Sequence, residues 1–286
     1  MAKYVTVQVT KKEPPVEPAG EGERCRRCQS FIPAAHLEAS LRVCPECGYH
    51  FVMSAPARIA QLGDRGTVHF VAQGLRAGDP LEFVDLRPYP ERLSQAQIET
   101  GLTEGLAAVE CEMGGKPTAL GVMDFRFLGG SMGSVVGETF RRLAESAVSR
   151  KTPLVIVAAS GGARMQEGLY SLMQMAKTVV SVQILGEAGL PFISVLTHPT
   201  TGGVLASFAT IADIIIAEPG AVMRFAGARV IEQTTREKLP PDFGSSESQL
   251  AHGQVDMVVD RRQLKDTLVR CLGFLSDSGS DGHAGR

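Results

Sequence analysis

The sequence predicts an α/β fold with a separate four-cysteine ribbon near its N-terminus. Strand-like apolar runs recur at residues 154–159, 191–197 and 213–218, and segments with helical periodicity lie between the earlier ones. Upstream of these runs, two CxxC pairs are separated by fifteen residues. The chain of 286 residues, 44% of them hydrophobic, is long enough to bury a large core. We therefore expect one large domain with a small N-terminal appendage.

Both ends of the chain are predicted to be tails. Residues 1–23 end in a stretch rich in Pro, Glu and Gly that offers little to bury, and residues 276–286 are rich in Ser, Gly and Asp. The ribbon is then expected at 24–51 and the α/β domain at 52–275. The chain has no run of about 18 apolar residues and no apolar segment followed by a small-residue cleavage site. We expect a cytoplasmic protein without a membrane partner.

The paired cysteines predict a structural zinc site. Cys25 and Cys28 form the first CxxC pair, and Cys44 and Cys47 form the second, with Gly48 following where a tight knuckle needs a permissive backbone. Two such knuckles bring four thiolates to one point, as tetrahedral zinc requires. Four free thiols are the alternative, but the spacing favours one Zn²⁺ per chain. Because four thiolates fill the coordination sphere, no position is left for catalysis.

The remaining cysteines and the ribbon's charges suggest no second function. Cys111 and Cys271 are isolated, which suits a reducing compartment, and we interpret them as core residues. Zinc ribbons occur in nucleic-acid binders, and four ribbon arginines make this one locally basic: Arg24, Arg26, Arg27 and Arg42. Glu38 and Glu46 offset them, aromatic residues are scarce, and the net charge is -2. We do not expect nucleic acid as the main partner, although contact with it stays open.

Elements between the ribbon and the buried strands are predicted in order. Helices are expected at 54–62 and 90–101. Apolar segments at 105–113 and 116–125 flank Gly114 and Gly115, and this pattern predicts a hairpin with a two-residue turn. A strand at 255–259 and an amphipathic helix at 261–275 close the domain.

Two amphipathic helices are expected between the strands, each burying its apolar face. Helical spacing relates Val136, Phe140, Leu143 and Ala147 in the first helix. In the second it relates Leu169, Leu172, Met173, Ala176, Val179 and Val180. We interpret Met165, Met173 and Met175 as helix core rather than as cofactor contacts.

Three glycine-rich turns, at 129–134, 160–164 and 200–203, carry the candidate chemistry, and the last two directly follow predicted buried strands. A strand that ends in glycines and opens a helix exposes backbone N–H groups, which bind a phosphate or an oxyanion. The chain lacks the GxGxxG and GxxxxGK[ST] patterns of nucleotide-binding loops and the GxSxG and HExxH patterns of hydrolases. Plain tight turns are the alternative, but the clustering favours one shared oxyanion site.

Four longer motifs are distinctive enough to compare with known families. They are GGSMGSVVGE at 129–138, SGGARMQEG at 160–168, ISVLTHPTTGGV at 193–204 and RVIEQTTREKLP at 229–240. Together with CRRC and CPECGYHF in the ribbon, they closely resemble the β subunits of bacterial multi-subunit acetyl-CoA carboxylase carboxyltransferases. The resemblance extends over about residues 24–272.

This resemblance implies a crotonase-like (ClpP/crotonase) spiral of ββα units with the zinc ribbon added at its N-terminus. It also implies transfer of a carboxyl group from carboxybiotin, held on a separate biotin carboxyl carrier protein, to acetyl-CoA. The product would be malonyl-CoA, for fatty acid biosynthesis. The family works with a carboxyltransferase α subunit in an α2β2 heterotetramer whose site lies at the subunit interface. The chain alone should therefore be inactive.

The resemblance maps the oxyanion donors of this subunit to Gly202 and Gly203, which would stabilise the enolate of acetyl-CoA. We expect Gly161 and Gly162 to complete the wall of the same substrate-binding pocket. Arg164 is interpreted either as a partner of the CoA phosphates or as half of a structural ion pair.

Three positions depart from the family's pattern. The family commonly has an acidic residue where His198 stands, a small residue at Arg224 and proline at Ala228. These departures bear on the geometry of the turn, on contact with the α subunit and on the choice between acetyl-CoA and propionyl-CoA. His198 is either a titrating group near the site or a structural residue.

Two other functions stay open at this point. One is a carboxyltransferase or decarboxylase subunit that acts on another acyl-CoA. The other is a zinc-ribbon protein that binds nucleic acid or regulates, and keeps the fold without catalysis. The intact glycine turns favour an enzyme, although a fold alone does not establish an activity.

Overall fold

The computed structural model describes residues 21–277, and the predicted α/β architecture is confirmed. Its strands are β1 (Gly22–Arg24), β2 (Phe31–Pro33), β3 (His69–Phe70), β4 (Leu106–Met113), β5 (Lys116–Met123), β6 (Leu154–Ser160), β7 (Phe192–Thr201), β8 (Ile214–Ala217), β9 (Met223–Arg224) and β10 (Met257–Val258). Its helices are α1 (Ala34–Ala39), α2 (Ala55–Leu62), α3 (Tyr89–Thr100), α4 (Ser134–Arg150), α5 (Leu169–Glu187), α6 (Gly202–Leu205), α7 (Ala228–Thr235), α8 (Ser246–Ala251) and α9 (Leu264–Asp277). Short 3-10 helices are η1 (Leu128–Gly130), η2 (Met165–Glu167), η3 (Phe208–Thr210) and η4 (Arg261–Gln263).

Ordered structure extends slightly into both predicted tails. Strand β1 begins at Gly22, inside the predicted tail 1–23, because it pairs with β2 to form the small sheet of the ribbon. Helix α9 continues to Asp277, inside the predicted tail 276–286. The rest of both tails lies outside the described residues.

The main sheet follows the order β10-β8-β7-β6-β5-β4-β3, with β9 beside the end of β7. Strands β5, β6, β7, β8 and β10 run parallel to one another, whereas β4 is antiparallel to both of its neighbours, β3 and β5. The predicted hairpin is confirmed: Met113 pairs with Lys116, and Gly114 and Gly115 take φ angles of 60° and 74°. Two consecutive positive φ angles match the twist of a hairpin and favour glycine at both positions.

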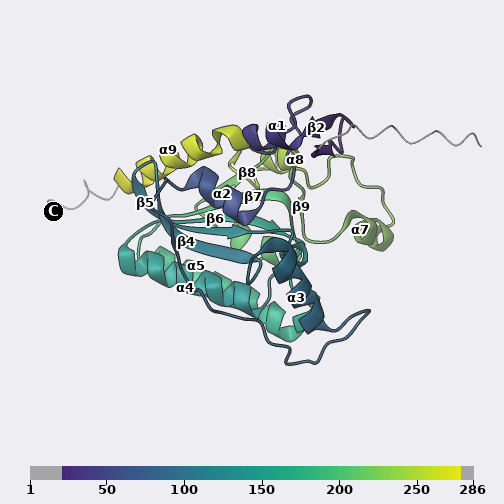
Figure 1. Cartoon of the computed structure of the whole chain (residues 1–286), viewed down its shortest axis with the longest axis horizontal. Coiled ribbons are helices and arrows are strands. Elements are labelled where there is room, and N and C mark those ends of the chain that lie inside the picture. Colours follow the sequence, from purple (N-terminus) through teal and green to yellow (C-terminus); the bar gives the residue numbers. More distant parts are fainter. Residues whose placement is uncertain (1–20, 278–286) are drawn as a thin grey trace, which may run out of the picture.

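Helices cover both faces of the sheet, so the domain has three layers (Figure 1). Alternate strand residues point to opposite faces: Leu154 of β6 lies in the core on the side of α4, and Val155 lies in the core on the side of α2 and α9. Cys111 is buried in the second core, as predicted, and Cys271 packs against it partly buried. The parallel strands read as continuous apolar runs because both of their faces are covered.

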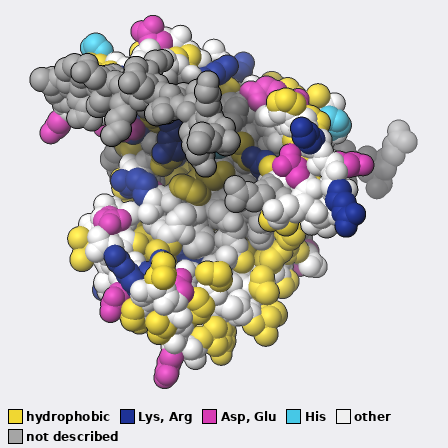
Figure 2. Space-filling model, turned by 90° about the vertical axis from the view of Figure 1, so that its right-hand side faces the viewer, with side chains coloured by type: hydrophobic (Ala, Val, Ile, Leu, Met, Phe, Trp, Pro, Cys, Tyr) yellow, Lys and Arg dark blue, Asp and Glu magenta, His cyan; other side chains and the backbone are white. Residues whose placement is uncertain are grey.

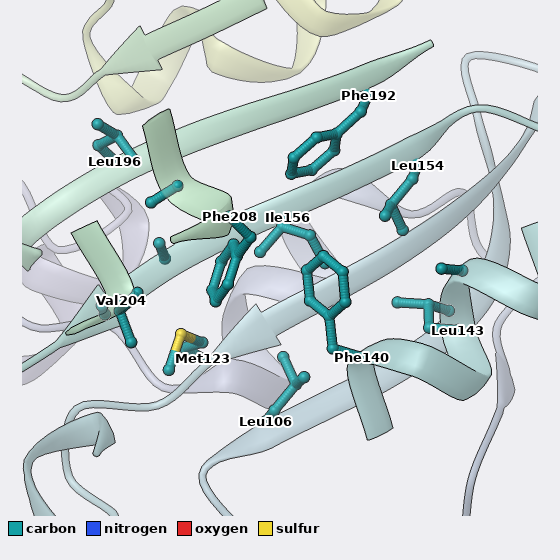
Figure 3. Packing of buried hydrophobic residues seen from close by; sticks show 14 of the residues in the cluster. Leu106, Met123, Phe140, Leu143, Leu154, Ile156, Phe192, Leu196, Val204 and Phe208 are labelled. Atoms are coloured by element: carbon teal, nitrogen blue, oxygen red, sulfur yellow. The ribbon is translucent and has the colours of Figure 1, made fainter. Parts of the chain in front are cut away.

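Aromatic side chains fill the space between α4 and the sheet (Figure 3). The ring of Phe140 meets that of Phe192 edge to face at a centroid distance of 6.2 Å and that of Phe208 at 4.8 Å. The face of α4 predicted to be buried is confirmed by the complete burial of its four residues: Val136, Phe140, Leu143 and Ala147. This packing holds α4, and the glycine turn that precedes it, against the sheet.

The corresponding prediction for α5 is wrong, because its apolar stripe faces outward. Leu169 is 69% exposed and Met173 57% exposed. The other predicted core residues of this helix are exposed too: Leu172, Ala176, Val179 and Val180. The buried face instead carries Ser171, Gln174, Thr178 and Ser181, whose side chains donate hydrogen bonds to backbone carbonyls of the preceding turn. Met165 is also exposed, whereas Met175 packs partly buried against the core.

A buried ion cluster attaches the ribbon to the α/β domain. Arg261 donates two hydrogen bonds to the carboxylate of Glu218, and its Nη1 donates to the carbonyl oxygen of Phe51 at 2.9 Å. Arg58 Nη2 lies 2.6 Å from Glu218, and His50 Nδ1 of the ribbon lies 3.2 Å from it. Burial alone would raise the pKa of Glu218, but the charges of the two arginines hold it well below its usual range. The cluster thereby fixes the ribbon beside the carboxyl ends of the sheet strands.

Candidate functional site

Two of the glycine turns meet at one edge of the sheet. Strands β6 and β7 are parallel neighbours, so the turns that follow them lie side by side. A Cβ atom added to Gly162 would lie 3.3 Å from Gly202 Cα and 3.4 Å from Gly203 N. Gly162 and Gly202 have φ angles of 119° and 58°, where side chains are strained. Glycine is therefore required here by both conformation and space.

The backbone N–H groups of these turns are not equally available. The amide of Gly161 donates to Gly129 O at 2.8 Å and that of Gly162 to Ser160 Oγ at 3.0 Å. The N–H groups of Gly202 and Gly203, which open α6, have no acceptor among the described residues, and neither has that of Ala163. Gly202, Gly203 and Ala163 therefore present donors that are free among the described residues, and the amides of Gly203 and Ala163 lie close together, while Gly161 and Gly162 shape the wall.

Ala163 is the site residue that sequence reasoning missed. A Cβ built on Gly203 would lie 3.5 Å from Ala163 N, so the two amides belong to one small region. Every residue except proline has an N–H, so the amino-acid type gave no signal. This donor is free because the hydrogen bonds between the two turns use the neighbouring residues, Gly162 and Arg164, instead.

The turn at 129–134 supports the other two. Met132 N donates to Gly162 O at 2.8 Å, and Arg164 N donates to Met132 O at 3.0 Å. At Gly130 a Cβ atom would lie 2.0 Å from the carbonyl oxygen of Ala159, so no side chain fits there. The third glycine turn thus packs its backbone directly on the wall of the site.

Arg164 is completely buried, and the structure favours the ion pair over a contact with CoA. Its guanidinium donates two hydrogen bonds to Glu104, at 2.5 and 2.8 Å, and Nη2 also donates to Ser131 O at 2.8 Å. Nη1 contacts Tyr89 Oη at 3.1 Å, and that hydroxyl donates to Glu167 at 2.7 Å. Burial alone would lower the pKa of Arg164, but Glu104 outweighs it and raises the pKa above its usual value. Arg164 therefore holds the glycine turns in place from the buried side of the site.

Replacing Arg164 with alanine is expected to lower the free energy of unfolding by about 3 kcal/mol, because Glu104 would stay buried without its partner. Denaturant unfolding of the full chain measures this change. The matched control is Arg142→Ala, which removes an exposed pair with Glu138 and should cost less than about 1 kcal/mol. Equal stability of the two variants would contradict the structural role of Arg164.

Two of the three positions that depart from the family's pattern, His198 and Arg224, lie at the same edge. His198 is in β7, three residues before Thr201, and its ring makes no hydrogen bond to another described residue. Burial lowers the pKa of His198, and the charges of Arg26 and Arg224 lower it further. Arg224 is paired in register with Thr201, next to the free amides, and Ala228 begins α7.

The four predicted zinc ligands converge in the ribbon. The Sγ atoms of Cys25 and Cys47 are 3.5 Å apart, and those of Cys28 and Cys44 are 3.7 Å apart. All four sulfurs lie within 4.8 Å of one another. A tetrahedral zinc ion with Zn–S bonds of about 2.3 Å would hold its sulfurs about 3.8 Å apart. The donor set and its spacing therefore fit one closed zinc site.

Comparisons with known proteins identify the family of this chain. The family model described as carboxyl transferase domain matches residues 82–272. Acetyl-coenzyme A carboxylase carboxyl transferase subunit beta of Thermus thermophilus is 54% identical over 252 residues, which are 88% of either chain. The protein named subunits beta/alpha in Parafrankia is 49% identical over 94% of this chain, which spans 44% of that longer protein. Transcarboxylase 12S has a TM-score of 0.65 at 24% identity, over 77% of this chain and 41% of its own, and so shares the fold.

Proposed function

Because this chain belongs to the carboxyl transferase family, we propose that it acts as the β subunit of an acetyl-CoA carboxylase carboxyltransferase. The family resemblance found in the motifs is thereby confirmed, and so is the crotonase-like fold with a four-cysteine cluster at its N-terminus. The proposed reaction forms malonyl-CoA from acetyl-CoA, in fatty acid biosynthesis. The main observation behind the proposal is that the neighbouring backbone N–H groups of Gly203 and Ala163 have no acceptor among the described residues.

The reaction requires the protein to stabilise one developing negative charge. A proton must pass from the methyl carbon of acetyl-CoA to the ureido nitrogen of biotin, whose bond to the carboxyl group has broken, and the methyl carbon then forms a bond to the carboxyl carbon. The electron pair left behind delocalises onto the thioester oxygen. N–H groups that are already fixed at the position of this oxygen lower the barrier, because they need no reorganisation during the reaction. Gly203 and Ala163 would hold the oxyanion in this way, and the glycines beside them let the thioester approach closely.

Biotin on its carrier protein would supply the carboxyl group in activated form when it is bound. We assign no residue of this chain to biotin. The residues described above instead account for the acyl-CoA half of the site. The partner α subunit would complete the other half, as the joined beta/alpha protein of Parafrankia suggests.

We propose that the α subunit docks on the outer face of α5, defined by its exposed apolar residues: Leu169, Leu172, Met173, Val180 and Ile184. A helix that turns hydroxyl groups inward and this stripe outward is arranged for a partner rather than for solvent. Met175, on the same helix, lies against the site, since a Cβ on Gly203 would be 3.1 Å from its Sδ. A partner on α5 would therefore adjoin the oxyanion site.

Replacing Leu172 with glutamate is expected to weaken association with the α subunit by at least about tenfold, because a charge would be buried in an apolar interface. Leu172 is 52% exposed, so the isolated chain should keep its stability. Sedimentation of the mixed subunits measures the association. The control Phe274→Glu changes an 81% exposed residue on α9, which packs on the opposite face of the sheet, and should leave association unchanged. Unchanged association of the Leu172 variant would place the α subunit elsewhere.

The direct test of function is reconstitution. The full chain is mixed with candidate α subunits, and decarboxylation of malonyl-CoA is measured in the presence of biocytin. Activity only in the mixture is expected. Activity of the chain alone, or none with any α subunit in either direction of the reaction, would contradict the proposal. Comparing acetyl-CoA with propionyl-CoA in the forward reaction then fixes the acyl preference.

We place the protein in the cytoplasm, with Zn²⁺ bound in the ribbon. Reduced thiols and metal-binding cysteines suit that compartment. Within residues 21–277, no helix combines the length and the apolar character needed to cross a membrane.

A further inference from the structure

The two neighbouring free amides of the candidate site belong to peptide units whose carbonyl groups are already held. Gly202 O, on the peptide that carries the N–H of Gly203, accepts from Ala206 N at 3.0 Å. The other free amide follows Gly162, whose carbonyl oxygen accepts from Met132 N at 2.8 Å. Because a peptide unit is planar, these bonds fix the direction of both N–H groups. The separation of the two turns is then the remaining variable of the site.

The side chain of Thr201 forms a hydrogen bond between these turns. Its Oγ1 donates to Ser160 O, at the end of the neighbouring strand β6, at 3.1 Å. Strand β9, which pairs with Thr201, lies on the right of Figure 1, and Figure 2 shows that side of the molecule with a hollow in its surface. Ser160 and Thr201 each directly precede a glycine pair. The hydroxyl therefore ties the two strands together at the point where both turns begin.

This hydroxyl does not cap the helix that it precedes. Thr201 is the N-cap residue of α6, and an N-cap threonine commonly accepts a hydrogen bond from the second or third helical N–H, here that of Gly203 or Val204. Thr201 makes no such bond. A hydroxyl that capped α6 through Gly203 would occupy the amide that the proposed oxyanion needs. Its bond to Ser160 O holds the hydroxyl against β6 instead.

The end of β7 before this residue is irregular and is also held by hydroxyl groups. Where β6 advances by two residues, from Ala158 to Ser160, β7 advances by four, from Leu196 to Thr200. Such a bulge bends a strand and changes the direction of the residues that follow it. Thr197 Oγ1 and Thr200 Oγ1 bond to Ala158 O at 2.8 and 3.0 Å. These bonds close the bulge on β6, so the glycine turn after it starts from a fixed position.

We propose that Thr201 is a positioning residue for carboxyl transfer. Through Ser160 O it sets the separation of the two free amides, and it withholds its own oxygen from the amide of Gly203. The inference rests on the proposed function, since it assumes that this amide binds the oxyanion. Thr201 itself touches no reacting atom in this account. It acts through the positions of Gly203 and Ala163.

Kinetics of three variants in the reconstituted enzyme test the inference. Thr201→Val keeps the branched shape and loses the hydroxyl, so kcat for malonyl-CoA decarboxylation is expected to fall about tenfold while KM changes little. Thr201→Ser keeps the hydroxyl and should restore most of kcat. The matched control Thr118→Val removes a buried hydroxyl that donates to Lys116 O at the start of β5, the opposite end of the parallel strands. It should leave kcat unchanged, and denaturant unfolding is measured for all variants.

The amide NMR signal of Ala163 measures the geometry without catalysis, since Ala163 lies on the other turn from the substitution. This signal should move in Thr201→Val and return in Thr201→Ser. An unmoved signal, or full kcat in a stable Thr201→Val variant, would overturn the inference. So would an equal loss of kcat in Thr118→Val, which would make the effect one of general stability. If the unchanged chain transfers no carboxyl group with any α subunit while the signal moves as expected, the proposed function fails and the positioning of the amides stands.

Discussion

Replacing Gly203 with valine is expected to lower the rate of carboxyl transfer by about 10³ in the reconstituted enzyme. A Cβ atom at this position would already lie 3.1 Å from Met175 Sδ and 3.3 Å from Ala163 Cβ, and valine adds two further methyl groups. The turn must move to accept them. Both free amides shift when it does, and the loss of one preorganised donor typically costs about 10² to 10³ in rate. Malonyl-CoA decarboxylation with biocytin and the α subunit measures the effect.

The control for this variant is Gly78→Val. Gly78 has open space around its Cα and no positive φ angle, so a side chain there meets nothing. Its activity should match that of the unchanged chain. Subunit association and stability of the Gly203 variant are measured alongside, so that misfolding is separated from loss of the donors. A stable Gly203→Val variant with full activity would remove the oxyanion role from this turn.

The glycine turns show which features of the candidate site can be predicted from the sequence. Strands followed by paired glycines predict that N–H groups are exposed at a sheet edge, because this depends only on local pattern. Which amides stay free depends on the acceptors that the fold brings to them. The amide of Gly161 donates to Gly129 O of a distant turn, and that of Gly162 donates to Ser160 Oγ two residues away. The sequence could therefore predict that the turns meet, but it could not separate the candidate donors from the residues of the wall.

The wrong prediction for α5 and the question left open at Arg164 have the same cause. Helical spacing in α5 defines an apolar stripe, but periodicity contains no information about whether the stripe meets the core or a partner. Likewise, Arg164 could be free or buried until Glu104, sixty residues earlier in the chain, is placed against it. Both questions concern long-range packing. By contrast, the hairpin at Gly114 and Gly115 was predictable because its turn is fixed by the two residues themselves.

Removal of zinc is expected to unfold the ribbon and to leave the α/β domain folded. The ribbon's own core is small, consisting of Ile32, Leu37 and Phe51 beside two of the cysteines. A unit of this size is not stable alone, whereas binding of structural zinc supplies about 10 to 16 kcal/mol in small zinc-binding peptides. Treatment with a chelator, or the variant Cys28→Ser, should abolish amide hydrogen-exchange protection across residues 22–51. Protection in β5, β6 and β7 should persist.

Cys271→Ser is the matched control, since this thiol lies outside the cluster and is only partly buried. It should retain zinc and ribbon protection. If ribbon protection survived in a zinc-free chain, the buried cluster around Glu218 would have to hold the ribbon folded instead. That outcome is disfavoured, because Arg261 binds carbonyl groups of the ribbon that exist in this arrangement only while it is folded. If zinc fills the ribbon as proposed, it acts first, by holding in shape the surface through which the ion cluster attaches the ribbon to the sheet.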